Sequence, residues 1–221
     1  MTIAFLTPVV LKSKVSPRAR RHLTMSSSRG GVNTVKICGM HTPEDARMVV
    51  EEARNLLPED VSLMLGMIMW PGSKRYVSTD VASKIACIAK DAGIPSVGVF
   101  VDEDANTMIA ARDAAGLDFV QLHGKASRDQ YDGLPPETPK LYVVDVKSNG
   151  EYTIDRPLSE KDLVLFDSKG GDNITTALTS LDPWGVDVAS GVNDEGGIRK
   201  DRAKLQRFLS HISKFYDLTA N

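Results

Sequence analysis

Three features of the sequence predict an α/β fold of the (β/α)8 TIM-barrel class, in which about seven strands are recognisable. Short β-rich segments alternate with helical segments, which is typical of a parallel sheet. Several strand segments end in a reactive or glycine-containing motif, and in a parallel barrel such ends meet at one face. The chain has 221 residues, 42% of them hydrophobic, so one globular domain with a sizeable core is expected.

The first half of the body carries the clearest alternation. Residues 35–39 predict the first strand, and Thr42-Pro43 then begins a helix, with a threonine N-cap and a proline at the first helical position. Further strands are predicted at 62–69, 96–101 and 119–122, and further helices from residue 78 or 79 to Gly93, at 104–115 and near 127–132.

The second half is shorter than a full barrel requires. Strands are predicted at 141–146, 163–166 and 186–188, and helices at 173–181 and over a last segment that ends near residue 215. Between the first two of these strands, residues 147–162 show little periodicity and predict an irregular crossover. The body after residue 31 has about 190 residues, fewer than the roughly 200 at the lower limit of this fold. One βα unit is therefore expected to be missing near residues 170–172.

The formal net charge of -2 hides an uneven distribution. Residues 1–31 contain several cations and no acid, and the first acidic residue of the chain is Glu44. A basic, serine-containing leader before an acidic globular body is typical of an organelle transit peptide. Residues 1–31 are therefore expected to be a disordered transit peptide, and 32–221 the βα-barrel domain. The alternatives are a nucleic-acid-binding tail and a plain disordered tail. The acidic body disfavours the first, because it would repel nucleic acid.

Cysteine content and hydropathy exclude several classes of protein. Cys38 and Cys87 form neither a disulfide framework nor a metal-ligand spacing, so a reducing compartment and no metal site are expected. No apolar run in the sequence approaches the roughly 18 to 20 residues that span a membrane.

Five motifs, in this order, carry a resemblance to a known family: Lys36-Ile37-Cys38-Gly39, Pro71-Gly72-Ser73-Lys74-Arg75-Tyr76, Val97-Gly98-Val99-Phe100-Val101, Gln121-Leu122-His123-Gly124 and Asp187-Val188-Ala189-Ser190-Gly191-Val192. Over residues 35–168 and 172–215 the chain resembles the phosphoribosylanthranilate isomerases of tryptophan biosynthesis. Any one of these motifs is weak, but five in order are specific. The basic leader is similar to that of the plant, plastid-imported branch.

The resemblance implies an isomerase that converts N-(5-phosphoribosyl)anthranilate into 1-(2-carboxyphenylamino)-1-deoxyribulose 5-phosphate. In this Amadori rearrangement a general acid opens the ribose ring to a Schiff base, and a general base removes the proton from the adjacent carbon. The resemblance also implies a small-molecule phosphoribosyl substrate and neither a metal nor an organic cofactor. With the acidic body and the lack of a long apolar run, no nucleic-acid or membrane partner is expected. The leader and the resemblance together predict a location in the chloroplast stroma.

The resemblance assigns roles to individual residues. Cys38 matches the general base and Asp167 the general acid. Arg75 matches the cation that pairs with the anthranilate carboxylate, Asp187 lies near the anthranilate amine, and His123 shapes the pocket. The phosphate-binding residues are expected to be Gly170, Gly171, Ser190 and Gly191. Structural roles are the alternatives: a buried core cysteine, a helix-capping aspartate, a solvated loop cation, a barrel-layer carboxylate and a hydrogen-bonded histidine.

The chain departs from this family after the assigned acid. Asp167-Ser168-Lys169-Gly170-Gly171 runs directly into Asp172, where the family has a further βα unit. Which of the family's two glycine pairs corresponds to Gly170-Gly171 stays open. One alternative is therefore a truncated, catalytically inactive splice-type variant. Another is a different phosphosugar-binding βα-barrel, such as a relative of indole-glycerol-phosphate synthase, which the Lys36-Ile37-Cys38-Gly39 motif disfavours.

Overall fold

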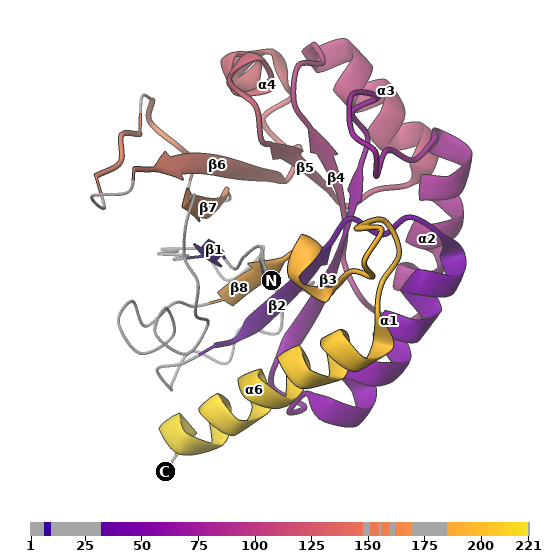
Figure 1. The fold of residues 1–221 in the computed structure, drawn as a ribbon. Helices are drawn as coiled ribbons and strands as arrows, with labels where there is room; N and C mark the ends of the chain where they lie inside the picture. The colour runs from indigo at the N-terminus through magenta and orange to yellow at the C-terminus, as the bar shows by residue number, and fades with distance from the viewer. Residues whose placement is uncertain are drawn as a thin grey trace.

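A computed structural model of the protein describes residues 7–9, 32–147, 151–154, 156–159, 162–168 and 185–220. Strands and helices alternate along the body (Figure 1). The strands are β1 (Thr7–Val9), β2 (Thr34–Cys38), β3 (Ser62–Ile68), β4 (Ser96–Phe100), β5 (Phe119–Leu122), β6 (Lys140–Val146), β7 (Leu163–Ser168) and β8 (Gly185–Val188). The helices are α1 (Pro43–Leu56), α2 (Thr79–Asp91), α3 (Ala105–Ala115), α4 (Lys125–Asp129) and α6 (Arg202–Ala220), with 3₁₀ turns η2 (Tyr131–Gly133) and η3 (Ser190–Val192).

Seven parallel strands form one curled sheet in the order β8-β2-β3-β4-β5-β6-β7. Figure 1 shows α1, α2 and α3 along its outer side, with α6 beside α1. The arrangement is a βα-barrel that stops short of closure, since in the described residues β7 pairs with β6 alone. The predicted fold class, with its seven recognisable strands, is confirmed.

The short strand β1 pairs antiparallel with β8, from Thr7 opposite Asp187 to Val9 opposite Gly185. It belongs to the segment expected to be a transit peptide, and the remainder of residues 1–31 lies outside the described residues. The helix predicted at 173–181 and the deletion expected near 170–172 also lie outside the described residues.

Local sequence signals set the helix boundaries. The hydroxyl of Thr42 accepts from the backbone N–H of Asp45 and caps α1, and that of Ser78 caps α2. Gly116 ends α3 at φ +69°, a left-handed conformation that glycine adopts without steric cost. The single short helix predicted near 127–132 is instead split into α4 and η2.

Apolar side chains form two layers, one on each face of the sheet. The larger layer lies between the strands and the helices and includes Ile37, Leu65 and Leu209. The smaller layer fills the inner face with Met64, Val97, Phe119, Leu141, Val143, Leu163 and Leu165. Because strand side chains alternate, Lys36 and Cys38 of β2 point to the inner face, opposite to Ile37.

Two buried carboxylates attach the C-terminal segment to α1. The single Nε–H of Arg199 is shared by both carboxylate oxygens of Asp45, at 3.0 and 2.9 Å, and Asp45 is 3% exposed. Glu52 accepts from Arg202 and from Gln206 Nε2. The Asp45 contact holds the segment between β8 and α6 against the start of α1, and the Glu52 contacts hold α6 itself against α1. Within the described ranges, we find no helix with the length and apolarity needed to traverse a bilayer.

Candidate active site

A pocket of about 340 Å³ lies at the C-terminal ends of the parallel strands. Its lining includes five of the residues assigned from the sequence: Cys38, Arg75, His123, Asp167 and Asp187. Active sites of parallel barrels lie at this face, and a volume in this range suits a small-molecule ligand. A larger depression of about 530 Å³ lies at the opposite end of the strands, and none of the assigned residues lines it.

Two glycines allow close approach around Cys38, which is 6% exposed. A Cβ on Gly66 of β3 would lie 2.9 Å from Cys38 Sγ, so only a glycine leaves room for the thiol. Gly39 has φ +77°, and a Cβ there would lie 2.8 Å from Arg75 Nη1. The guanidinium of Arg75 therefore lies directly over the end of the strand that carries the thiol.

An ion pair crosses the inner face of the sheet between β2 and β8. Lys36 Nζ lies 2.9 Å from Asp187 Oδ2, and the two side chains are 2% and 12% exposed. Burial lowers the pKa of Lys36, but the Asp187 carboxylate and the Cys38 side chain outweigh burial and raise it above the ordinary value. Lys36 is therefore a permanent cation beside the assigned base.

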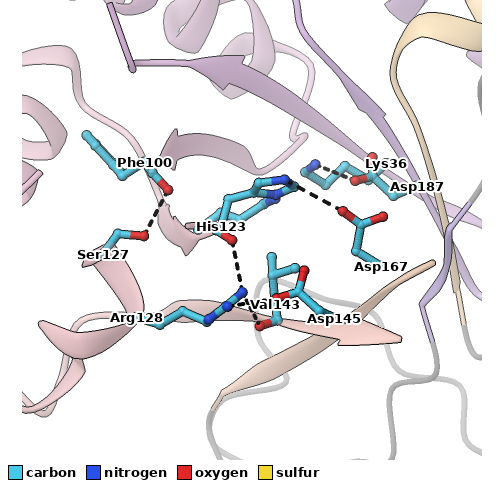
Figure 2. Close-up of polar contacts among 10 residues, drawn as sticks. Lys36, Phe100, His123, Ser127, Arg128, Val143, Asp145, Asp167 and Asp187 are labelled. Carbon is cyan, nitrogen blue, oxygen red and sulfur yellow. Dashed lines mark hydrogen bonds and ion pairs between the residues drawn. The ribbon is translucent and has the colours of Figure 1, made fainter. Parts of the chain in front are cut away.

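His123 faces Asp167 across the pocket (Figure 2). Its Nε2 lies 3.7 Å from Asp167 Oδ2, and its Nδ1 lies 3.2 Å from the side-chain amide of Gln121. Burial lowers the pKa of His123 by more than the neighbouring Asp167 raises it, and Lys36 lowers it further. The imidazole is therefore neutral near pH 7, and one of its nitrogens faces the carboxyl group that the sequence assigns as the acid.

Arg128 of α4 joins the ends of β5 and β6, as Figure 2 shows. Its guanidinium donates to the carbonyl oxygens of His123, at 3.0 Å, and Val143, at 3.3 Å, and to the carboxylate of Asp145, at 2.7 Å. Ser127 Oγ donates to the carbonyl oxygen of Phe100 at 3.0 Å, which attaches the same helix to β4. These bonds fix the backbone from which His123 projects.

Lys200 joins the ends of β2 and β8 behind the thiol. Its Nζ donates to the carbonyl oxygens of Cys38, at 2.7 Å, and Ala189, at 3.0 Å, and to Asn193 Oδ1, at 2.7 Å. Burial lowers its pKa to about 7. Lys200 thus fixes the assigned base relative to the turn that follows β8.

Three polar atoms of the pocket lining are buried and have no hydrogen-bond partner among the described residues: Arg75 Nη1, Gln121 Oε1 and Asp187 Oδ1. Buried polar groups are nearly always paired, so three such atoms in one pocket indicate groups that a ligand completes. A cation, an amide oxygen and a carboxylate oxygen suit a ligand with both anionic and donor groups.

The assigned phosphate-binding residues fall in two places. Ser190 and Gly191 form the 3₁₀ turn η3 directly after β8, at the same end of the sheet as the pocket. Gly170 and Gly171 lie outside the described residues. Lys74, next to Arg75, donates to the carbonyl oxygen of Gly196 at 3.2 Å, which joins the segment after β3 to the segment after β8. Across the described ranges, His, Cys, Asp and Glu side chains form no group of three that could bind a metal ion.

The model of the N-(5'phosphoribosyl)anthranilate (PRA) isomerase family matches residues 35–172. The chain belongs to this isomerase family. N-(5'-phosphoribosyl)anthranilate isomerase 1, chloroplastic, of Arabidopsis thaliana is 32% identical over 211 residues, covering 80% of this chain and 74% of the relative. The N-(5'-phosphoribosyl)anthranilate isomerase of Streptococcus pneumoniae (strain Taiwan19F-14) is 30% identical over 206 residues, covering 80% of this chain and 94% of the relative.

Solved isomerases of this family share the fold. The phosphoribosyl anthranilate isomerase of Thermotoga maritima superposes with a TM-score of 0.66 at 22% identity, covering 82% of this chain and 98% of that chain. A phosphoribosyl anthranilate isomerase in complex with reduced 1-(o-carboxyphenylamino)-1-deoxyribulose 5-phosphate superposes with a TM-score of 0.63 at 24% identity, with the same coverage. Membership of this family favours an isomerase over the other phosphosugar-binding barrels considered from the sequence.

Sequence reasoning missed three residues of this isomerase-type site as separate contributors: Lys36, Arg128 and Lys200. A signal for the first was present, because a lysine within the apolar strand Thr34–Cys38, two residues before the thiol, must share its inner face. Arg128 and Lys200 lie in polar segments where nothing in the local pattern distinguishes them from exposed cations. Their partners come from strands distant in sequence, so only the tertiary structure identifies them.

Proposed function

We propose that this protein catalyses the Amadori rearrangement of N-(5-phosphoribosyl)anthranilate to 1-(2-carboxyphenylamino)-1-deoxyribulose 5-phosphate in tryptophan biosynthesis. One observation carries the proposal: Cys38 of β2 and Asp167 of β7 line one pocket together with the unpartnered guanidinium nitrogen of Arg75. A base, an acid and a cation for a carboxylate are the groups that this reaction on a carboxyphenyl substrate needs. Family membership supports the same reaction.

Asp167 is the proposed general acid. In its protonated form the carboxyl donates its proton to the ribose ring oxygen, the bond between C1 and that oxygen breaks, and the anilino nitrogen forms a Schiff base with C1. The neutral imidazole of His123, 3.7 Å away, adds no second positive charge to a site in which the Schiff-base nitrogen becomes cationic. Asp167 is partly exposed, with 28% of its side chain accessible, so a ligand can reach it.

Cys38 is the proposed general base. As a thiolate it takes the proton from C2, and the electron pair of that bond forms the double bond of an enaminol and neutralises the Schiff-base nitrogen. The enaminol then tautomerises to the 2-ketose. A thiolate requires nearby positive charge, and Lys36 interacts with the Cys38 side chain.

The remaining residues bind and orient the substrate in this proposal. Arg75 pairs with the anthranilate carboxylate, since a guanidinium matches a carboxylate through two parallel hydrogen bonds. The free Oδ1 of Asp187 accepts from the anilino nitrogen. The backbone amides of Ser190 and Gly191, with Gly170 and Gly171, bind the phosphate. Turns after the last strands of a barrel commonly have this role.

The test is turnover of freshly generated phosphoribosylanthranilate, followed by loss of its fluorescence. Cys38→Ala and Asp167→Asn should each lower the rate by about 100-fold to 10,000-fold, the range for loss of an acid or base group. Cys87→Ala is the matched control, because Cys87 is exposed on α2 and should leave the rate unchanged. A folded wild-type protein without turnover would instead support the inactive splice-type variant.

We propose further that the protein acts in the chloroplast, with residues 1–31 as its transit peptide. The cations of this segment are Lys12, Lys14, Arg18, Arg20, Arg21 and Arg29, and no acid accompanies them. The names of the Arabidopsis relatives include the word chloroplastic, which supports the same location here. A basic, acid-free leader is the ordinary signal for import into an organelle.

A further inference from the structure

The buried ammonium group of Lys36 is paired with Asp187, and its side chain shares one face of β2 with the Cys38 thiol. Lys36 and Cys38 are two residues apart on β2, so both side chains project from its inner face. A Cβ on Gly66 would lie 2.9 Å from Cys38 Sγ and 3.1 Å from Lys36 Cε, so both side chains pack against one point of β3. The ammonium lies 2.9 Å from Asp187 Oδ2 and also interacts with the Cys38 side chain.

We propose that Lys36 is the counter-ion of the Cys38 thiolate, and that Asp187 competes with the thiolate for the same ammonium group. Lys36 is then a positioning residue. Its ammonium stabilises the thiolate and so sets how readily the thiol ionises, whereas the competing Asp187 carboxylate weakens that stabilisation. The catalytic consequence rests on the proposed isomerase function, but the ionisation of Cys38 itself does not.

Four other charged or titratable groups lie near the thiol: Arg75 after β3, His123 after β5, Asp167 on β7 and Lys200 after β8. The ammonium of Lys200 is bound to three oxygen acceptors, including the backbone carbonyl of Cys38. Because burial lowers the pKa of Lys200 to about 7, its charge is lost as the pH rises. The pKa of Lys36 is raised despite its burial, so Lys36 remains charged throughout the range in which a thiol titrates.

The proposed C2 deprotonation leaves the charges around Lys36 balanced. Before proton transfer, the Lys36 ammonium and the cationic Schiff base face the Cys38 thiolate and the Asp187 carboxylate. The thiolate then takes the C2 proton and becomes a thiol, and the electron pair of the broken bond neutralises the Schiff base. One cation and one anion remain, paired at 2.9 Å. The C2 deprotonation thus leaves a matched ion pair in this buried site, which avoids the large cost of an unpaired ion.

The experiment measures the alkylation rate of Cys38 by iodoacetamide as a function of pH, by peptide mass spectrometry on the full chain. Lys36→Met should raise the pH of half-maximal rate by about one unit or more, the usual effect of losing an opposite charge within 4–6 Å. Asp187→Asn should lower that pH, because the ammonium then faces the thiol alone. If the ion pair had a purely structural role, the two substitutions would not shift the pH of half-maximal rate in opposite directions.

Cys87, exposed on α2, is the internal control, and its pH of half-maximal rate should be the same in every variant. If Lys36→Met fails to fold, Lys36→Met combined with Asp187→Asn removes both charges and should still give a higher pH of half-maximal rate than wild type. The proposal is overturned if the pH of half-maximal rate is unchanged in Lys36→Met or in this double variant. It is also overturned if both single variants shift this pH in the same direction. Since alkylation needs no turnover, an inactive protein with these shifts refutes the isomerase function alone.

Discussion

The lack of a side chain at Gly39 leaves room for the guanidinium of Arg75 at the pocket. Gly39 follows Cys38 with φ +77°, and a Cβ there would meet Arg75 Nη1 at 2.8 Å. That nitrogen is buried and has no acceptor among the described residues. A buried donor without an acceptor costs about 1–3 kcal/mol. A ligand carboxylate at this position would supply the missing acceptor.

Arg75→Ala should therefore raise KM by roughly 10- to 100-fold, the effect of one lost charge-assisted hydrogen bond of about 1.5–3 kcal/mol. The effect on kcat should be smaller, since the proposed contact of the guanidinium is with the carboxylate and not with the reacting carbons. Lys84→Ala, which removes an exposed cation on α2, is the control for a general change of charge. Steady-state kinetics of both variants measure the difference. An unchanged KM for Arg75→Ala would place the carboxylate elsewhere.

At the scale of the elements, a single buried lysine connects two strands. Lys200 precedes α6 and donates to carbonyl oxygens at the ends of β2 and β8. Arg199, the residue before it, is bound to Asp45 of α1. The ends of two strands and a helix are thereby fixed to one short segment, which sets the distance between the assigned base and the turn at Ser190.

The charge of Lys200 should make stability depend on pH. Its pKa is about 7 in the folded chain against an ordinary 10.5. Between these values the unfolded chain binds the proton and the folded chain does not, so the free energy of unfolding rises with pH. In the wild type the free energy of unfolding should rise by about 1–3 kcal/mol between about pH 6 and about pH 9, and Lys200→Met should abolish this rise. Denaturant unfolding at both pH values measures it, with Lys84→Met as the control. If the free energy of unfolding changes with pH by the same amount in the wild type and in Lys200→Met, Lys200 keeps its proton in the folded state.

At the scale of the whole molecule, the sheet leaves one side of the barrel without a parallel strand. In the described residues β7 pairs only with β6, and β8 pairs with β2 and with the antiparallel strand β1. Unpaired strand edges invite association with other chains. The role of residues 1–31 therefore matters for the fold as well as for targeting, because a cleaved leader would take β1 with it.

We expect residues 1–31 to direct a fused reporter into plastids, and the body from residue 32 to unfold cooperatively and retain turnover without them. A leader in which the six cations are replaced by serine is the matched control, and it should leave the reporter in the cytosol. If the body alone loses its cooperative unfolding, β1 is part of the folded enzyme and the leader is not removed. Fluorescence microscopy and denaturant unfolding give the two readings.

The sequence by itself determined the order of the seven parallel strands and of the described helices between them, because alternation and capping are local properties. The strand predicted at 119–122 has the observed bounds, and Thr42 caps the start of α1 as predicted. It also placed Cys38, Arg75, His123, Asp167 and Asp187 at strand ends, which a parallel barrel must bring to one face. Their catalytic and binding roles stay predictions that the experiments above test.

Only the tertiary structure decided which charges meet. The pairing of Lys36 with Asp187 joins residues from two ends of the chain, and Lys200 and Arg128 reach carbonyl oxygens of strands that are distant in sequence. A lysine in a polar segment has the same local pattern whether it is exposed or buried. Its burial, its partners and hence its pKa depend on long-range packing, and the electrostatics of this pocket arise at that level.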